Sequence, residues 1–378
     1  MKKSKMLIRS LVAAMTFGVV SLTANAGALP VSATILEFAE ENTLFVADSD
    51  GGQILAYTLP AVQPATVSAS YNLEGTGTKI AELLGVDSRV VSYHDIAIHP
   101  VSKEAYISLS IQEGATRTPV VIRADQAGSL TKVDLDSLPY TAKKLTDTAT
   151  DEVTFWRDIP ATTLGITDLD YVNGTLYVSS LSTGEFASTL RKVSYPFDQS
   201  ETTSNVEIYH TVHNQTETRA PIRAMTVLDL DGVETVVAAY TCTPLVTIPT
   251  GELSDGAHVK GKTIAELGYG NTPLDVIHFS APNQQQQMED FVLVVHKERS
   301  ADLIRVADLA KANKAIARGV SAKSYYDAVV VGKGWVSSSK TWPPMRGATT
   351  CTPSAVAAAM MRSMGSTQLC RAKSKRPQ

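Results

Sequence analysis

The sequence predicts an all-β fold of the β-propeller class, in which short antiparallel strands form repeated four-stranded units. The first observation is a hairpin signal at Asn173-Gly174, between the alternating runs Asp168–Val172 and Thr175–Ser180. Asn-Gly favours a type I′ turn, because both central residues of that turn have positive φ. A third run, Thr189–Val193, follows. The second observation is that the same pattern occurs four more times, which indicates a repeat protein.

The other four units lie on both sides of this stretch, and each supplies three strand-like runs joined by short connections. In chain order the runs are 35–38, 43–47 and 53–57; 95–98, 105–109 and 120–123; 224–228, 235–240 and 245–248; and 276–279, 291–296 and 303–306. A shorter echo predicts a fourth strand in some units: it reads Ile80-Ala81-Glu82-Leu83, Ile264-Ala265-Glu266-Leu267-Gly268 and Ile316-Ala317-Arg318-Gly319. Four antiparallel strands per unit, repeated about an axis, are typical of a propeller.

The number of blades is open between five and seven. The unit starts fall near residues 34, 95, 168, 223 and 275. These spacings exceed the roughly 40–50 residues of a minimal blade. Asp125–Trp156 can therefore hold an additional irregular blade. A β-sandwich is the alternative fold, since it also has short strands with turn signals. The repetition of a whole unit favours the propeller, which also leaves few free strand edges.

The pattern over about residues 33–320 resembles secreted propellers of the YVTN and NHL-like type. The resemblance is general, because neither a WD dipeptide nor a kelch double-glycine signature recurs. It implies a shape and does not imply an activity.

The two ends of the chain differ from the repeats. Residues 1–26 have a basic start, a short apolar run from Leu11 to Leu22 and the cleavage pattern Ala24-Asn25-Ala26, which predicts a secretory signal peptide. We therefore expect an exported protein, periplasmic or extracellular, with the propeller in residues 27–322. Residues 323–378 contain nine Lys or Arg and one acid, Asp327. Two explanations of this segment remain: a basic tail, or a reading frame altered near Ala322.

The composition excludes some classes of partner. The 378-residue chain has a formal net charge of −4 and is 6% aromatic, which is not typical of a nucleic-acid binder. No apolar run is long enough for a membrane span. We therefore expect a small molecule or a protein as the partner. Of the three cysteines, Cys242, Cys351 and Cys370, at least one is unpaired within a single chain.

Alignment of the units places Asp95, Asp168, Arg223 and Asp275 at one equivalent position, with Thr34 in the first unit. The first strand of each propeller blade lines the central channel, so we expect a ring of these side chains at the channel mouth. Two interpretations are open. The side chains can bond the backbone of the neighbouring unit. Alternatively, they form a ligand site, in which Asp95, Asp168 and Asp275 can hold Ca²⁺ or a similar ion and Arg223 can clamp a carboxylate.

The sequence thus predicts a binding protein for a small ligand or a protein partner at the channel mouth. The first alternative is a metal-assisted hydrolase of the lactonase or esterase kind, and the second is an interaction scaffold. His94 is the candidate base of an enzyme, because it adjoins Asp95 at the proposed mouth.

Overall fold

A computed structural model describes residues 30–40, 42–65, 75–125, 127–150, 154–155, 159–184, 186–198, 200–210, 215–282, 285–297 and 301–315. The predicted signal peptide, the 323–378 tail and the 316–319 echo lie outside these ranges. None of the helices described there is long and apolar enough to cross a membrane.

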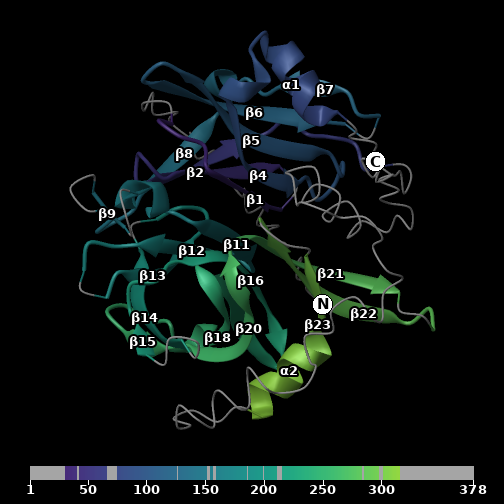
Figure 1. Ribbon diagram of the computed structural model, residues 1–378. Helices are drawn as coiled ribbons and strands as arrows, with labels where there is room; N and C mark the ends of the chain where they lie inside the picture. Colours follow the sequence, from purple (N-terminus) through teal and green to yellow (C-terminus); the bar gives the residue numbers. More distant parts are fainter. Residues whose placement is uncertain are drawn as a thin grey trace, which may run out of the picture.

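The described chain is mainly β and is divided into several mostly antiparallel sheets, three of them with four strands (Figure 1). Sheet 1 contains β1 (Ile35–Ala39), β2 (Thr43–Asp48), β3 (Gln53–Thr58) and β8 (Tyr140–Lys144). Sheet 2 contains β4 (Val91–Ile98), β5 (Ala105–Glu113), β6 (Thr116–Ala124) and β7 (Leu130–Lys132). Sheet 3 contains β11 (Asp168–Val172), β12 (Thr175–Leu181), β13 (Ser188–Ser194), β14 (Thr202–His210), β15 (Gln215–Glu217) and β19 (His258–Lys260).

Two further large sheets follow in the chain. Sheet 4 contains β16 (Ile222–Leu230), β17 (Val233–Tyr240), β18 (Cys242–Pro249) and β20 (Lys262–Asn271). Sheet 5 contains β21 (Pro273–Pro282), β22 (Met288–His296) and β23 (Asp302–Arg305). β9 (Thr154–Phe155) pairs with β10 (Ile159–Pro160). The helices are α1 (Thr76–Leu84) and α2 (Val306–Ala315), with 3₁₀ turns at Ser88–Val90, Leu135–Ser137, Ala161–Leu164 and Thr250–Glu252.

The hairpin at Asn173-Gly174 is confirmed. β11 pairs with β12 in a register that places Val172 opposite Thr175, so the loop has two residues. The φ angles of Asn173 and Gly174 are 49° and 82°, as a type I′ turn requires. The same turn joins β16 to β17, where Asp231 and Gly232 have φ angles of 55° and 83°. The local sequence therefore determines the register of both hairpins.

Sheet 1 is interrupted in the sequence by sheet 2. The chain forms β1, β2 and β3, then builds all of sheet 2, and returns to add β8 beside β3. The interval 125–156 thus supplies β7, β8 and β9 where the sequence suggested an additional blade. Sheet 1 is therefore built from two separate segments of the chain, whereas the strands of sheet 2 follow one another in the sequence.

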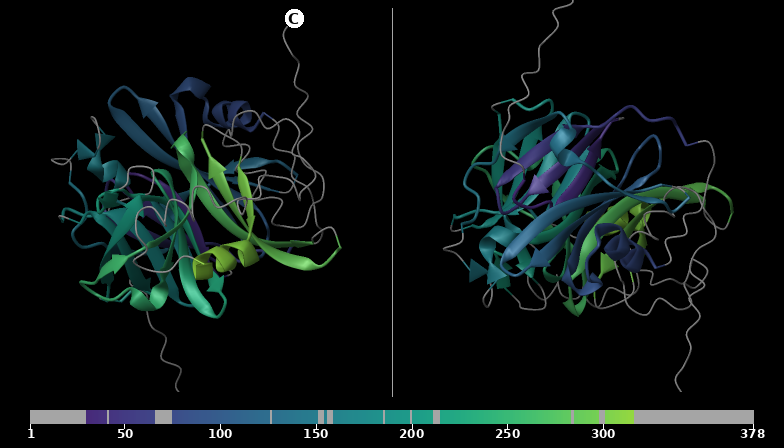
Figure 2. Two further views of the ribbon diagram at one scale, coloured as in Figure 1. Left: turned by 60° about the horizontal axis from the view of Figure 1, so that its bottom comes forward. Right: turned by 90° about the horizontal axis from the view of Figure 1, so that it is seen from above.

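The first strands of the five sheets, β1, β4, β11, β16 and β21, are neighbours near the middle of the molecule (Figures 1 and 2). β1 packs between β4 and β11, β11 also packs against β16, and β16 packs against β21. The spatial order of the sheets is therefore 2, 1, 3, 4 and 5. This arrangement of antiparallel sheets about a common centre is consistent with a propeller.

A hydrophobic cluster fills each of the five interfaces between neighbouring sheets. One cluster joins Leu36 and Val46 of sheet 1 to Tyr106 and Val121 of sheet 2. Others join sheets 1 and 3, 3 and 4, and 4 and 5. The fifth joins sheet 2 to sheet 5, where Ile107 and Ile122 share a cluster with Leu293 and Val295. Since apolar burial is the main stabilising term, these interfaces hold the sheets in place.

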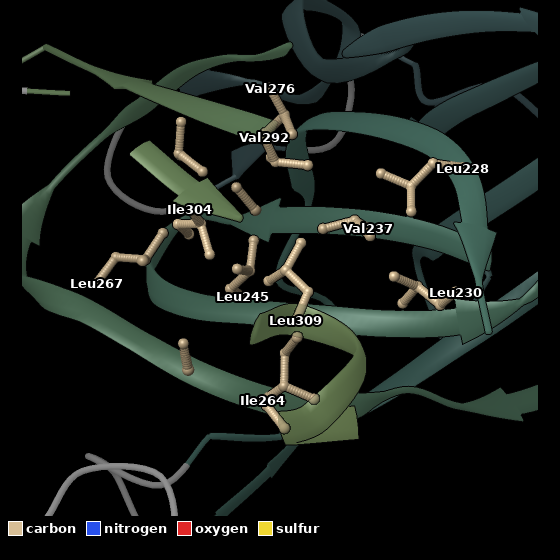
Figure 3. Packing of buried hydrophobic residues seen from close by; sticks show 14 of the residues in the cluster. Leu228, Leu230, Val237, Leu245, Ile264, Leu267, Val276, Val292, Ile304 and Leu309 are labelled. Carbon is tan, nitrogen blue, oxygen red and sulfur yellow. The ribbon is translucent and has the colours of Figure 1, made fainter. Parts of the chain in front are cut away.

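Helix α2 extends the cluster between sheets 4 and 5 (Figure 3). Leu309 is fully buried and lies among Leu245 and Ile264 of sheet 4 and Ile304 of sheet 5. Sheet 5 has three described strands, and α2 follows its last strand directly. The helix thus covers apolar surface beside a sheet that is narrower than its neighbours.

Of the predicted fourth strands that lie in the described residues, one is a strand and one is a helix. Ile264–Gly268 lies in β20, the outer strand of sheet 4, so a strand is confirmed there. Ile80–Leu83 lies in helix α1, so that part of the prediction is wrong. In the helix Ile80 and Ala81 are buried on one side, and Gly85 ends it in a left-handed conformation. The short echo has helical as well as strand periodicity, and Gly85 supplies a helix C-terminal signal.

Replacing Gly174 by alanine is expected to destabilise the protein by about 1–2 kcal/mol, because a Cβ is unfavourable at φ 82°. The matched control is Gly251→Ala, since an added Cβ at Gly251 meets no atom within 4 Å and its φ lies outside the left-handed range. The measurement is chemical denaturation of both variants. Equal unfolding free energies for the two variants would contradict the assigned role of the turn.

Candidate functional site

A cavity of about 280 Å³ lies where the five inner strands meet. All five of these strands, β1, β4, β11, β16 and β21, contribute lining residues. The first strand of each unit that the sequence predicted thus contributes to one cavity. Its volume is near the lower end of the range for small-molecule pockets.

Five carboxylates line this cavity: Glu37, Asp95, Asp168, Asp170 and Asp275. The structure thus brings together the three aspartates that the sequence predicted as a group, and it adds two acids. Asp170 lies two residues beyond Asp168 in β11, and Glu37 lies in the corresponding strand β1. The two-residue period of a strand places residues i and i+2 on one face, so this signal was present in the sequence.

Asp95 and Asp168 each accept a hydrogen bond from the backbone of the neighbouring sheet. The Leu36 N–H in β1 donates to Asp95 Oδ2 at 2.8 Å. The Met225 N–H in β16 donates to Asp168 Oδ2 at 2.5 Å, and the Leu169 N–H donates to Asp168 Oδ1 at 2.9 Å. Each carboxylate therefore links its own inner strand to the next one. Bonding to the backbone of a neighbouring unit is one of the two roles that the sequence predicts for these side chains.

Asp170 makes the same kind of hydrogen bond two residues further along β11 and β16. The Val227 N–H in β16 donates to Asp170 Oδ2 at 2.5 Å. Asp168 and Asp170 thus bind alternate N–H groups of a single neighbouring strand, Met225 and Val227. The pair fixes how β11 and β16 are aligned along their length.

Asp275 occupies the equivalent place in β21 and differs in its contacts. Its Oδ2 atom is buried and has no hydrogen-bond partner among the described residues. The Val276 N–H lowers the pKa of the Asp275 carboxyl by hydrogen bonding, as the Leu169 N–H does for Asp168. Asp275 therefore retains the contact within its own strand and lacks the contact to a neighbouring strand.

Burial raises the pKa values of all five carboxyls, and repulsion between the cavity acids adds to this for three of them. Burial is the largest cause, and it raises the pKa of Asp95 and of Asp170 to about 6. The pKa values of Glu37, Asp168 and Asp275 are raised well above their ordinary values by burial and by the charges of neighbouring aspartates. The backbone N–H donors act in the opposite direction, since they stabilise the charged form.

Arg223 does not line the cavity. The pairing of β16 with β17 shifts between Ile222 and Ala224, so Arg223 is the extra residue of a β-bulge. The same shift occurs before Asp95 in β4 and before Asp275 in β21. By register the equivalent of these two aspartates is therefore Ala224. Burial lowers the pKa of Arg223, whose Nε atom is buried and has no described partner, and the charge of Asp168 opposes this shift.

His94 is the bulge residue of β4 and also lies outside the cavity lining. The residue is exposed, and its Nε2 atom is 2.9 Å from Ser110 Oγ. Desolvation of the ring and the charge of Arg117 lower the pKa of His94 to about 4, so the ring is neutral at pH 7. His94 as the base of an enzyme stays a prediction.

The described residues contain no group of three or more His, Cys, Asp or Glu side chains placed to hold a metal ion. The carboxylates come from four different strands, and three of them already accept N–H donors of a neighbouring strand. The proposed Ca²⁺ site at Asp95, Asp168 and Asp275 stays a prediction. What the arrangement provides is a small, acidic cavity in which one buried carboxylate oxygen, Asp275 Oδ2, has no partner among the described residues.

Comparison with known proteins gives distant structural likenesses. No family model matches the chain, and no curated protein matches it. Drosophila semaphorin 1b, extracellular domains 1–2, matches with a TM-score of 0.33 and 7% identity over 74% of this chain and 75% of that one. A structure of Drosophila plexin A in complex with semaphorin 1b matches with a TM-score of 0.30 and 8% identity, over 74% and 75%.

A third match is a DUF4623 family protein from Bacteroides eggerthii, with a TM-score of 0.25 and 8% identity over 80% of this chain and 58% of that one. All three TM-scores are too low to define a fold or a function for this chain.

The raised pKa values predict that the carboxyls destabilise the folded protein as the pH rises. A carboxyl with a higher pKa in the folded than in the unfolded chain binds more protons when folded, so its stabilising contribution is present below about pH 4 and is lost through about pH 6. Asp95→Asn keeps an oxygen acceptor for Leu36 and removes one titration. We expect this variant to lose less stability between pH 4 and pH 6 than wild type, by roughly 1–3 kcal/mol.

The measurement is urea denaturation at pH 4, 5, 6 and 7. Asp231→Asn is the matched control, because Asp231 is an exposed turn residue outside the cavity whose ion pair with Lys314 lies at the surface. An identical pH dependence of wild type and Asp95→Asn would contradict the raised pKa of the Asp95 carboxyl.

Proposed function

We propose that this chain is an exported five-bladed β-propeller that binds a small ligand in the cavity between its inner strands. Sheets 2, 1, 3, 4 and 5 would be the blades, in that order around the axis. Sheet 2 closes the ring against sheet 5. The five apolar interfaces support this closure, because each sheet shares one cluster with the sheet on either side.

The observation that carries the proposal is the cavity itself. Every inner strand contributes to its lining, and the lining combines carboxylates with apolar residues such as Met225 and Ile277. Ligand sites in proteins are concave and mainly apolar, with a few polar groups that fix the orientation of the ligand. A site at the common centre of the sheets would also bind a ligand without any change in the strands.

The metal-assisted hydrolase is the competing function at the same residues. It would need a bound ion to polarise a substrate carbonyl, with Asp95, Asp168 and Asp275 as ligands. Ligand binding needs the cavity and its charges alone, and both are present. For this reason binding is the better-supported function.

The test begins with the mature protein from Gly27 and a thermal-shift screen against small amines, carboxylates, sugars, neutral polyols and divalent ions. A ligand that binds the folded state raises the Tm as its concentration exceeds Kd. To locate the site, His278→Cys is made in a background where the three native cysteines are serine. His278 lines the cavity and is exposed, so a benzyl methanethiosulfonate label there can block the cavity after folding.

The labelled His278→Cys protein is expected to lose the thermal shift, and reduction of the label should restore it. Ser280→Cys is the matched control: Ser280 lies on the same strand, is exposed and does not line the cavity. The proposal fails if no class of compound binds, or if blocking at residue 278 has no more effect than blocking at residue 280.

A further inference from the structure

We propose that the ligand is a small organic cation with N–H donors, an alkylammonium or guanidinium compound, anchored by Asp275 where β21 faces β4. This inference rests on the proposed function, since it names the class of ligand and the anchoring residue of the same cavity.

The contact between β21 and β4 differs from the other four contacts between neighbouring inner strands. β21 and β4 approach each other less closely than β1 and β4, β1 and β11, β11 and β16, or β16 and β21. Both strands nevertheless line the cavity, through Ile96 to Ile98 and through Val276 to His278. Behind the inner strands, sheets 2 and 5 are joined by their shared apolar cluster. The wider separation is therefore a local feature of the two inner strands.

Asp275 lies on the side of β21 that faces β4. Ile277, two residues further along and therefore on the same face of the strand, packs against the cluster shared with sheet 2. By register Asp275 corresponds to Asp95 and Asp168, and its counterparts accept an N–H from the next inner strand. Across the wider separation no described N–H reaches Asp275 Oδ2. The carboxylate is thus placed like its counterparts and lacks their donor.

An unpaired acceptor in a buried site is costly, and a ligand that supplies the donor removes this cost. The charges around Asp275 decide which donor fits. Burial is the largest cause of the raised pKa of the Asp275 carboxyl, and the negative charges of Asp95 and Asp170 raise it further. No Lys or Arg is among the described lining residues, and partial desolvation of its ring lowers the pKa of the lining residue His278. A positively charged donor is therefore attracted to the cavity, and an anion is repelled.

The size and spread of the acceptors favour an organic cation over a bare ion. The cavity of about 280 Å³ is several times the roughly 30 Å³ that one water molecule occupies in the liquid. Its five carboxylates come from four strands, and no three of them are placed among the described residues to hold one metal ion. Ammonium and guanidinium groups carry several N–H donors, which can bind acceptors in different directions. A short carbon chain can contact Met225 and Ile277 in the same lining.

The test compares two probes of equal length by isothermal titration calorimetry: 1,4-diaminobutane as the cation and 1,4-butanediol as its neutral analogue. The diamine is expected to bind and the diol is not. Asp275→Asn should weaken the diamine at least tenfold, because the variant loses a charged hydrogen bond. The control Asp231→Asn removes one exposed aspartate charge outside the cavity and should leave the affinity within twofold of wild type.

Calcium chloride alone and sodium acetate are the remaining probes. Binding of calcium without binding of the diamine would overturn the organic-cation proposal, and so would binding of acetate or of the diol; the cavity would still bind a ligand in each case. Equal diamine affinity in wild type and Asp275→Asn would remove Asp275 as the anchor. If Asp275→Asn does not fold, hydrogen exchange of wild type decides: the diamine should protect β21 and β4, and protection elsewhere would contradict the proposal.

Discussion

The arrangement of the inner strands depends on carboxylates that accept backbone N–H groups from the next strand. Asp95 binds the Leu36 N–H, and Asp168 and Asp170 bind the N–H groups of Met225 and Val227. An inner strand pairs with its own sheet along one edge, so the N–H groups of its other edge need acceptors near the centre. Carboxylates satisfy them strongly, because a charged acceptor forms shorter and stronger hydrogen bonds than a neutral one. Repulsion among the acids accompanies this arrangement and raises their pKa values.

Apolar packing sets the distances within which these hydrogen bonds form. Each sheet presents both faces to neighbours, so its strands are buried on both sides: residues 44 to 48 of β2 are all buried. Leu44 and Val46 belong to the cluster with sheet 2, whereas Phe45 and Ala47 belong to the cluster with sheet 3. Alternation along one strand thus serves two interfaces. The return of β8 to sheet 1 after sheet 2 is complete then fastens these two sheets to each other through the chain itself.

The strands and the hairpins could be predicted from the sequence because their signals are local. Asn173-Gly174 determines its turn, and the alternating runs of all five units are strands in the structure. β8 could not be predicted, since its partner β3 lies beyond the whole of sheet 2. The alignment at Arg223 was one residue off: Arg223 is the bulge residue of β16 and corresponds to His94 of β4, and a bulge leaves no clear sequence signal there. The sequence analysis did not predict Asp170 and Glu37 as lining residues of the cavity. Strand alternation would have indicated Asp170, because it lies on the same face of β11 as Asp168.

The sequence also could not distinguish Asp275 from Asp95 and Asp168. Asp95 and Asp275 follow the bulge residue of β4 and of β21, and Asp168 begins β11. All three accept the N–H of the following residue. Their difference arises from the neighbouring strand, which is close enough to donate in two cases and too far in the third. One residue type at one position can therefore hold the fold together or remain open to a ligand. Which of the two it does depends on the distance to the neighbouring inner strand, because the sheets behind β21 and β4 still share an apolar cluster.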